Sequence, residues 1–579
     1  MRSFSPIRGV VPLLCLSLAA VVGACGGNAS GSKFDDSESA GASAQGGGAQ
    51  GGDGQAGGGA QGGKGGAFNA GGAGGGVQPP TGDPNTCEGA ASLKSYVGCD
   101  YWPTVTANNV WSSFDFAVIV ANAGNEPADV EVEQGGTKVG QTVTVAPNSL
   151  EKIYLPWVPA LKGGDADSCG TAKPLGGTLG AVKGAYHLTS TRPVTVYQFN
   201  ALEYKGAGGP PGKSWASCAG NKACDNIASP SYGTKIGCFS FSNDASILLP
   251  STAMTGNYRV TIRKGWPAAN MGAYMVITGT ADGTQVKVKL SGTAKVLGGA
   301  GIAAAGAGAV VSFTVNKGDV LELVGEASAD LSGSLVQATA PVQVLTGMPC
   351  AQAPDGVQAC DHLEETVFPA ETLGKRYFVS PMTGPRGNAP GHIVRIYGNV
   401  DGTQLTYKPS KPANAPSTIN AGQVVELSGT VKTSFEVEGD HEFAVGTFMP
   451  GAEVLDPSAG AGKELGDPSM SMVTAVEQFR TKYVFLAPDD YDVSYADLLI
   501  PDGASVKLDG APITAKPTAI SSGFGVARVK LGAGQKGAHT LESDKPVGLQ
   551  VMGYGSYTSY QYPGGLNLIA IAPPPPDIE

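Results

Sequence analysis

The stretch HTLESDKPVGLQVMGYG, residues 539–555, contains a strand-like run, a short polar turn, and a Pro-Val pair that opens a second strand-like run. The same element recurs as YHLTSTRPVTVYQFNAL (186–202), as GSLVQATAPVQVLTGMPCA (333–351) and, more weakly, as FEVEGDHEFAVGTFMPGA (435–452). Proline cannot donate to a β-ladder and is therefore confined to strand starts and edges. Its recurrence before valine predicts a repeated strand–turn–strand unit.

Two further elements recur in a constant order with the first. One is an Asp-Gly turn that feeds a strand, seen as TADGTQVKVKL (280–290), NVDGTQLTYKP (399–409) and IPDGASVKLDG (500–510). The other leads into a tyrosine-containing strand, seen as SILLPSTAMTGNYRVTI (246–262), TVFPAETLGKRYFVSP (366–381) and AVEQFRTKYVFLAP (475–488). Asp-Gly supplies the positive φ that a tight hairpin requires. The three elements together define units that begin near residues 97, 246, 366 and 474.

Between these elements the chain is made of short runs rich in Val, Ile, Thr, Tyr and Phe, and we find no long stretch with a helical period. The sequence therefore predicts an all-β fold of tandem β-sandwich-like repeat units, with a β-propeller-like arrangement as the alternative. The expected β units cover residues 87–245, 246–365, 366–473 and 474–579, and the last includes a proline-rich tail.

The N-terminus has the pattern of an export signal. Arg2 and Arg8 precede an apolar run that ends in VGAC, residues 22–25, so residues 1–24 are expected to be a lipoprotein signal peptide. The VGAC sequence resembles a bacterial lipobox, which implies lipidation of Cys25 and anchoring to a membrane through lipid. Gly26 stands where aspartate would resemble an inner-membrane retention signal, so we expect an outer-membrane protein at the cell surface.

Residues 25–86 follow the signal as a lipidated cysteine and a glycine-rich linker. This segment offers almost no apolar side chains for a core, so burial cannot offset the entropy of ordering it. We therefore expect a disordered tether that holds the β units away from the lipid headgroups.

The ordered set of motifs resembles bacterial lipoproteins, of the myxobacterial type, that carry a domain similar to the N-terminal domain of the IgG-Fc-binding protein family. The matching segments are VGCDYWPTVTANNVWSSFDFAVIVAN (97–122), AYHLTSTRPVTVYQFNALEY (185–204), SNDASILLP (242–250), CDHLEETVFPAETLGKRYFV (360–379) and YGSYTSYQYPGG (554–565). The resemblance implies a non-catalytic, extracellular β-rich protein involved in adhesion, whose partner is an unidentified extracellular protein or glycan.

The cysteines fit an exported protein. Eight remain after Cys15 leaves with the signal and Cys25 is lipidated, and an even number in an exported chain predicts disulfides. Two short separations predict the pairs Cys218–Cys224 and Cys350–Cys360. The connectivity of the other four is left open: Cys87, Cys99, Cys169 and Cys238.

Motifs for chemistry are absent from the sequence. It contains no metalloprotease helix motif, nucleophile elbow or Walker loop, and no cofactor is expected. The net charge of −11 argues against a nucleic-acid partner. The segment CDHLEE (360–365) offers possible ligands but no second ligand cluster, so we expect a salt-bridged loop rather than a metal site. An envelope hydrolase of polysaccharide or peptide remains the alternative, since two suitably placed carboxylates would suffice.

The last repeat ends in a tyrosine-dense run with Tyr554, Tyr557, Tyr560 and Tyr562. These side chains either cap the edge of the final unit, with rings packed and hydroxyls bonded, or form a ligand-contact surface far from the anchor. Our hypothesis for the second case is that at least two of the four are exposed to solvent.

Replacement of Cys25 tests the anchor. Cys25→Ser removes the thiol that carries lipid, so metabolic fatty-acid labelling should vanish and the chain should leave the membrane fraction or remain unprocessed. Unchanged labelling and fractionation of the variant would contradict the lipoprotein assignment.

Overall fold

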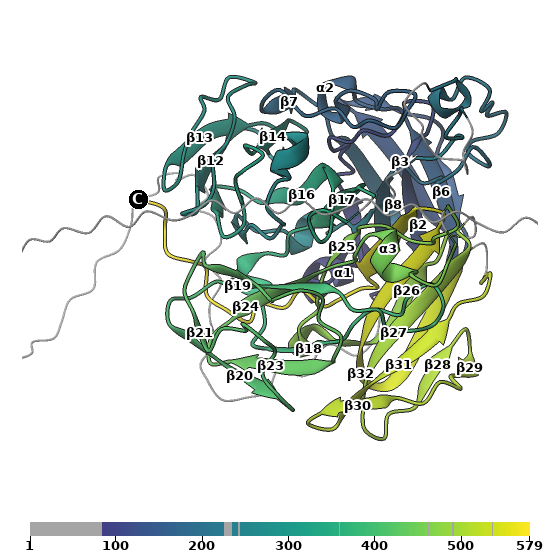
Figure 1. The fold of residues 1–579 in the computed structure, drawn as a ribbon, viewed down its shortest axis with the longest axis vertical. Helices are drawn as coiled ribbons and strands as arrows, with labels where there is room; N and C mark the ends of the chain where they lie inside the picture. Colours follow the sequence, from purple (N-terminus) through teal and green to yellow (C-terminus); the bar gives the residue numbers. More distant parts are fainter. Residues whose placement is uncertain are drawn as a thin grey trace, which may run out of the picture. The chain divides into compact units, whose positions relative to one another are not determined.

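The computed structural model describes residues 84–224, 234–240, 244–357, 359–460, 462–488, 491–534 and 537–579. The expected signal peptide, Cys25 and the expected linker up to residue 83 lie outside these ranges. All the described residues belong to one compact unit. Within them, no helix is long and apolar enough to cross a membrane. Nearly every regular element is a strand, which confirms the all-β prediction (Figure 1).

The strands fall into four successive repeats. Repeat 1 contains β1 (Gly98–Tyr101), β2 (Phe116–Asn122), β3 (Ala128–Gln134), β4 (Thr137–Lys138), β5 (Val143–Val145), β6 (Ser149–Leu155), β7 (Leu179–Ala181), β8 (Tyr186–Asn200) and β9 (Ala245–Ile247). Repeat 2 contains β10 (Asn257–Arg259), β11 (Tyr274–Gly279), β12 (Thr284–Lys289), β13 (Val310–Val315), β14 (Val320–Val324), β15 (Leu335–Ala338), β16 (Val342–Ala351) and β17 (Asp361–Thr366).

The second half of the chain repeats the same order. Repeat 3 contains β18 (Arg376–Val379), β19 (Ile393–Gly398), β20 (Thr403–Lys408), β21 (Thr418–Ile419), β22 (Val424–Glu426), β23 (Phe435–Gly439), β24 (Phe443–Phe448) and β25 (Met470–Met472). Repeat 4 contains β26 (Arg480–Leu486), β27 (Val493–Pro501), β28 (Val506–Leu508), β29 (Ala511–Pro512), β30 (Thr518–Ser521), β31 (Phe524–Lys530), β32 (Ala538–Gly555) and β33 (Thr558–Pro563).

The helices are short. The α-helices are α1 (Cys87–Leu93), α2 (Pro159–Lys162) and α3 (Ala452–Leu455). Single 3₁₀ turns are η1 (Ala219–Asn221), η2 (Ser251–Ala253), η3 (Pro267–Ala269), η4 (Ala370–Thr372) and η5 (Val476–Gln478).

Repeats 2 and 3 each build two antiparallel sheets with one topology, whereas in repeats 1 and 4 the long strands β8 and β32 join the strands into one eight-stranded sheet. The first sheet of repeat 2 has the order β10-β15-β12-β13 and the second the order β17-β16-β11-β14, to which repeat 1 adds β7. Repeat 3 has the corresponding orders β18-β23-β20-β21 and β25-β24-β19-β22. No clear β-propeller is formed, because the repeats do not each form one four-stranded blade: repeats 2 and 3 divide their strands between two sheets, and repeats 1 and 4 form eight-stranded sheets.

The Pro-Val pair marks the place where the chain passes from the first sheet to the second. In repeats 2 and 3 the strand breaks there, between β15 and β16 and between β23 and β24. In repeats 1 and 4 the expected turn is absent, because β8 and β32 run through Pro193 and Pro546 without interruption. The first half of β8 pairs with β1 and β3, and its second half pairs with β2 and β9. Proline is tolerated at this crossover because the ladder partner changes there.

A buried tyrosine in the first strand of every repeat fastens this crossover. Its hydroxyl donates to the carbonyl of the residue that opens the second sheet, and the pairs are Tyr101–Val194 at 2.6 Å, Tyr258–Val342 at 2.6 Å, Tyr377–Phe443 at 2.5 Å, and Tyr483–Val547. In repeats 2 to 4 the same oxygen accepts from the backbone N–H three residues earlier, which belongs to Thr255, Gly374 or Arg480. All four rings are buried.

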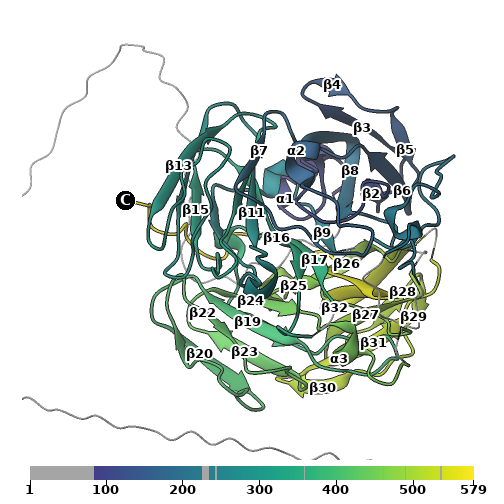
Figure 2. The same ribbon diagram turned by 45° about the horizontal axis from the view of Figure 1, so that its top comes forward.

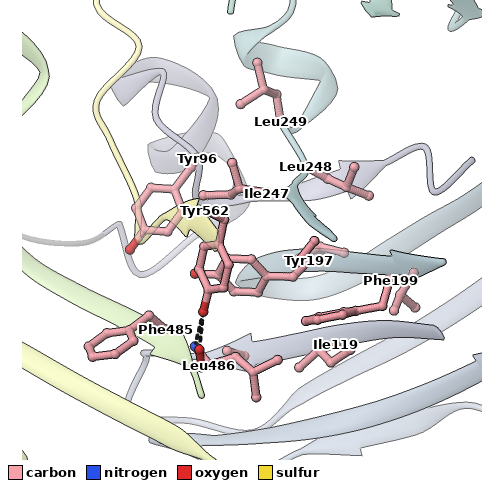
Figure 3. Packing of buried hydrophobic residues seen from close by; sticks show 14 of the residues in the cluster. Tyr96, Ile119, Tyr197, Phe199, Ile247, Leu248, Leu249, Phe485, Leu486 and Tyr562 are labelled. Atoms are coloured by element: carbon pink, nitrogen blue, oxygen red, sulfur yellow. Dashed lines mark hydrogen bonds between the residues drawn. The ribbon is translucent and has the colours of Figure 1, made fainter. Parts of the chain in front are cut away.

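The last strands of the repeats meet one another. β9 contacts β17, β17 contacts β25, β25 contacts β33, and β33 contacts β9. Figure 2 shows β9, β17 and β25 next to one another although they come from three repeats. Figure 3 shows the apolar packing beside this junction, where Tyr197 of repeat 1 lies against Tyr562 of repeat 4 with ring centroids 4.9 Å apart.

The chain end ties repeat 4 back to the others. After β33, the N–H of Leu568 donates to the carbonyl of Lys94 at 2.9 Å, and that of Ile571 donates to the carbonyl of Glu371 at 2.7 Å. Farther along, the N–H of Ile578 donates to Gln337 Oε1 of repeat 2 at 2.5 Å. The proline-rich tail therefore connects segments of the chain that the β-ladders do not join.

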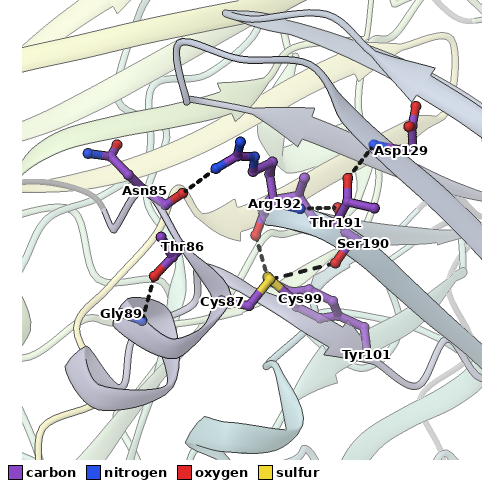
Figure 4. The surroundings of a disulfide bond; sticks show 11 residues. Asn85, Thr86, Cys87, Gly89, Cys99, Tyr101, Asp129, Ser190, Thr191 and Arg192 are labelled. Atoms are coloured by element: carbon purple, nitrogen blue, oxygen red, sulfur yellow. Dashed lines mark hydrogen bonds between the residues drawn. A yellow bond between two sulfur atoms is a disulfide. The ribbon is translucent and has the colours of Figure 1, made fainter.

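Four disulfides are present: Cys87–Cys99 (Figure 4), Cys169–Cys224, Cys218–Cys238 and Cys350–Cys360. The short-turn pair Cys350–Cys360 is therefore formed, but the predicted pair Cys218–Cys224 is wrong. The 3₁₀ turn η1 follows Cys218 and packs on a later segment, with the N–H of Gly237 donating to the carbonyl of Gly220 at 3.0 Å. This contact places Cys218 beside Cys238 and leaves Cys224 to reach Cys169.

Loss of one crossover hydroxyl should destabilise the protein. Tyr258→Phe leaves the Thr255 N–H and the Val342 carbonyl without their buried partner, which should cost about 1–3 kcal/mol. Denaturant titration measures this difference. As a control, Tyr407→Phe removes a half-buried hydroxyl bonded to the carbonyl of Pro416 and should cost less. Equal losses for the two variants would contradict a special role for the crossover tyrosines.

Candidate functional site

The tyrosines of the last repeat do not form an exposed surface. Tyr554, Tyr560 and Tyr562 are 0% exposed, and Tyr557 is half-buried. Their hydroxyls are engaged: Tyr554 donates to the carbonyl of Thr383 at 2.5 Å, Tyr560 bonds Ser494 at 3.0 Å, and Tyr557 bonds Glu464. The hypothesis that at least two of the four are solvent-exposed is therefore wrong, because β33 contacts β9 and β25 instead of ending the fold at a free edge.

The segment CDHLEE is a buried strand and not a salt-bridged loop. It forms the start of β17, where Asp361, His362, Glu364 and Glu365 are all at most 1% exposed. Strand β17 pairs with β16 on one side and contacts the last strands of repeats 1 and 3. The acidic side chains of β17 therefore lie at the junction between repeats, and no lysine or arginine of the described part of the chain forms an ion pair with them.

Glu364 is the most highly bonded of these groups. Its carboxylate accepts hydrogen bonds from four side chains of repeat 1: Thr106 at 2.6 Å, Gln198 at 2.9 Å, Asn200 at 2.5 Å and Ser246 at 2.7 Å. Burial raises the pKa of Glu364 to about 7, and the four donors limit this rise. The arrangement fixes repeat 2 against repeat 1 through one carboxyl group.

Other buried carboxyls surround the same junction. Asp244 Oδ2 accepts the backbone N–H of Met470 at 2.8 Å and that of Glu364 at 3.2 Å, so it joins repeats 1, 2 and 3. Burial raises the pKa of Asp244 well above its usual range. Burial also raises the pKa of Asp467 to about 8, and the pKa of Asp361 rises through burial and the neighbouring Asp467. With a pKa of about 8, Asp467 is largely protonated at neutral pH, which removes the cost of burying its charge. The raised pKa values of Asp244 and Asp361 favour the neutral form in the same way.

Such a cluster superficially resembles catalytic machinery, since perturbed carboxyls often mark active sites. Its members, however, are nearly inaccessible: Asp244, Asp361, Glu364 and Asp467 are at most 1% exposed. None of them lines the open groove described below. Among the described residues, no group of His, Cys, Asp and Glu is arranged to hold a metal ion. The geometry fits a packing role between repeats better than hydrolysis.

An open groove lies elsewhere, between repeat 4 and the chain end that follows it. It has a volume of about 640 Å³, and its wall is mostly apolar: Val476, Phe479, Pro501, Phe524, Pro546, Ile569, Ala570 and Ile571, with Glu477 and Lys545 also lining it. Pro546 and Ala570 are exposed, and Val476, Phe524 and Ile571 are half-exposed. A concave apolar wall with a few charged groups is the usual form of a binding site.

The fold supplies each wall of this groove. Phe524 begins β31, and its ring stacks on Phe378 of repeat 3 with centroids 4.5 Å apart. Val476 belongs to the turn η5 before the crossover tyrosine strand of repeat 4. The tail residues Ile569–Ile571 are held in place by the hydrogen bond from Ile571 to Glu371. Sequence reasoning missed this groove. The one local signal was an Ile-Ala-Ile run in a segment otherwise rich in proline.

Comparison with known proteins identifies the class. The fold defines a nearly all-β protein built from four successive repeats. The model of the family "IgGFc binding protein" matches residues 244–553, more than half of the chain, and the chain belongs to this family. The family takes its name from a binding protein.

The human IgGFc-binding protein is 27% identical over 342 residues, which cover 58% of this chain and 6% of that protein. The chain thus corresponds to a small part of its human relative. A solved anti-sigma factor domain-containing protein from Clostridium clariflavum is 12% identical, with a TM-score of 0.11 over 53% of this chain and 81% of that one, and this likeness carries no argument.

The buried acids should make stability depend on pH. A carboxyl whose pKa is raised on folding stabilises the folded state below its unfolded pKa and loses that contribution as pH rises through the folded value. Burial lowers the pKa of His362 and His392 to about 3. These histidines make stability rise with pH, against the fall caused by the acids, but only below pH ~6.5. Burial also lowers the pKa of His187, but hydrogen bonds to Asp100 and Glu133 raise this pKa overall, so His187 acts in the same direction as the acids above pH ~6.5. Between pH ~6.5 and 8 the melting temperature should therefore fall, with Asp467 contributing about 2 kcal/mol.

Asp467→Asn tests the assignment, because the amide mimics the protonated acid and should flatten the fall. Asp401→Asn, at an exposed turn, serves as the control and should keep the wild-type slope. A wild-type melting temperature that rises from pH 6.5 to 8 would contradict the protonated state of the junction.

Proposed function

We propose that this protein is a non-catalytic lipoprotein of the outer cell surface that holds an extracellular protein segment in the groove between repeat 4 and the chain end. The lipobox-like VGAC sequence and the glycine-rich linker support the anchored, surface-exposed placement. Family membership supports a binding role, and the relative's name specifies IgG Fc as the ligand of that protein. The observation that carries the proposal is the open apolar groove of about 640 Å³.

The chemistry of the groove favours protein over glycan. Its walls offer aliphatic, proline and phenylalanine side chains, which gain most by covering apolar side chains of a partner. A glycan would need a wall rich in hydrogen-bonding groups, whereas the only charged lining residues are Glu477 and Lys545. An extended segment with two or three apolar anchors therefore fits the groove better than an oligosaccharide.

An envelope hydrolase remains the second reading of the sequence, but the structure offers it less support. The carboxyls with raised pKa lie in the junction between repeats, where substrate has no access. The carboxylate at the open groove, Glu477, has no second carboxylate among the lining residues. Glycoside hydrolysis requires two carboxyls on opposite sides of the scissile bond.

The groove can be tested with two defined probes, a random peptide library displayed on phage and the human IgG Fc fragment. Wild-type protein should enrich peptides with apolar anchors. Ile571→Asp introduces a charge into the apolar wall and should reduce binding of the enriched peptides at least tenfold, since burying an uncompensated charge is costly. Isothermal titration of a selected peptide measures the loss.

Val182→Asp is the matched control, because Val182 is an 83% exposed valine outside the groove. This variant should bind as wild type does, and both variants should keep the wild-type melting profile. Equal binding by Ile571→Asp and wild type would exclude the groove as the peptide site. Enrichment of glycans on an array, with no peptide enrichment, would exclude a protein ligand. Binding of Fc would show that this chain shares the ligand named for its human relative.

A further inference from the structure

The first sheet of repeat 2 ends in an edge strand that is long and uncharged. Strand β13, with the sequence VVSFTV, is the terminal strand of the order β10-β15-β12-β13, and no described strand pairs with its outer side. Its six residues include no charge, proline or glycine. An edge of this kind presents a row of free backbone groups and is a template for another strand. Figures 1 and 2 both draw β13 at the margin of the described strands.

The corresponding edges of repeats 3 and 4 are protected. Strand β21 has two residues, and the chain before it is KPSKPANAPS (408–417), with three prolines and two lysines. Strand β29 has two residues, one of which is Pro512. Repeat 1 divides the same edge between two short strands, β4 and β5, and β4 carries Lys138. Short strands, lysine and proline are the usual means of blocking edge-to-edge pairing. Repeat 2 lacks all of them.

The free groups of β13 can be assigned from the ladder. The N–H of Leu290 donates to the carbonyl of Ala309 at 2.9 Å, and the β12–β13 register continues from there. Hydrogen-bonded pairs alternate in an antiparallel ladder, so Val311, Phe313 and Val315 direct their backbone groups to β12. Val310, Ser312 and Thr314 therefore direct their N–H and C=O groups outward.

The side chains of β13 also leave apolar surface at this edge. Val310 is one of two large apolar residues with an exposure of 36% or more among the described residues, and Phe313, on the core face, is half-exposed. A strand that continued the sheet beyond β13 would complete the burial of Phe313. The occupant must therefore add an extended strand that brings an apolar side chain over Phe313.

We propose that β13 pairs antiparallel with β13 of a second copy of this chain, about a two-fold axis at Ser312. In this register Ser312 lies opposite its own copy, Val310 lies opposite Thr314, and Val311 lies opposite Phe313 on the core face. The outward groups of both strands form roughly six hydrogen bonds. Neither strand carries a charged residue, so no like charges face each other across the contact. Val311 of each copy covers Phe313 of the other. An isologous contact of this kind closes at two copies.

The register makes a sharp prediction for cysteine crosslinking of the full chain. Across the two-fold axis the two Ser312 Cα atoms lie about 5.5 Å apart, within the range for a disulfide. Ser312→Cys should therefore form a covalent dimer under mild oxidation, visible on a non-reducing gel. Thr314→Cys is the matched control on the same strand, because its two copies lie about 14 Å apart. It should crosslink no more than wild type.

A second variant tests the contact without a crosslink. Ser312→Lys places two like charges opposite each other across the axis and leaves the buried face of β13 unchanged. Sedimentation velocity over a range of concentrations should show a reversible dimer for wild type and a monomer for this variant, both with the same melting profile. A monomeric wild type at every concentration would overturn the proposal. So would equal crosslinking of the two cysteine variants, or capture of another protein by Ser312→Cys in place of a second copy.

Discussion

The hydrogen bond between a buried tyrosine hydroxyl and the backbone at the sheet crossover is the constraint on which the rest of this structure depends. In each repeat the chain leaves one sheet and enters the other at the same point, where ladder bonds are interrupted. A carbonyl buried there without a partner would be costly. The four hydroxyls, from Tyr101, Tyr258, Tyr377 and Tyr483, satisfy it and fix the distance between the two sheets.

The last strands of the four repeats, β9, β17, β25 and β33, contact one another at a common junction. Polar groups dominate this junction, and it is held together by hydrogen bonds that cross repeat boundaries. Glu364 of repeat 2 accepts from four side chains of repeat 1, and Asp244 accepts backbone groups of repeats 2 and 3. Acids rather than bases serve here because a protonated carboxyl is neutral and can still donate and accept, so burial does not leave an uncompensated charge.

The proposed contact surfaces lie away from the junction. The junction buries the most aromatic stretch of the chain, so its buried tyrosines are not available to a partner, and the proposed binding uses the groove and the edge of β13 instead. The apolar groove forms because η5 and β31 of repeat 4 lie beside the returning segment Ile569–Ile571. The edge of β13 is open for a different reason, namely that repeat 2 lacks the prolines and lysines that close the equivalent edges. Strand β13 and the segment Ile569–Ile571 both lie outside the three sequence elements that recur from repeat to repeat.

The sequence by itself determined the all-β class, the fourfold recurrence of strands and the positions of the Asp-Gly turns, because alternation, turn residues and proline act over a few neighbouring positions. The expected tight hairpins at these turns are wrong, because each Asp-Gly turn joins two strands that do not pair with each other. It also indicated Cys350–Cys360, whose loop is short. Only the tertiary structure decided that Tyr554, Tyr560 and Tyr562 are buried, that Cys218 bonds Cys238, and that CDHLEE lies in the junction. Each of these depends on contacts between segments far apart in the chain. A local pattern can specify that a residue is in a strand, but only the docking of repeats specifies what covers it.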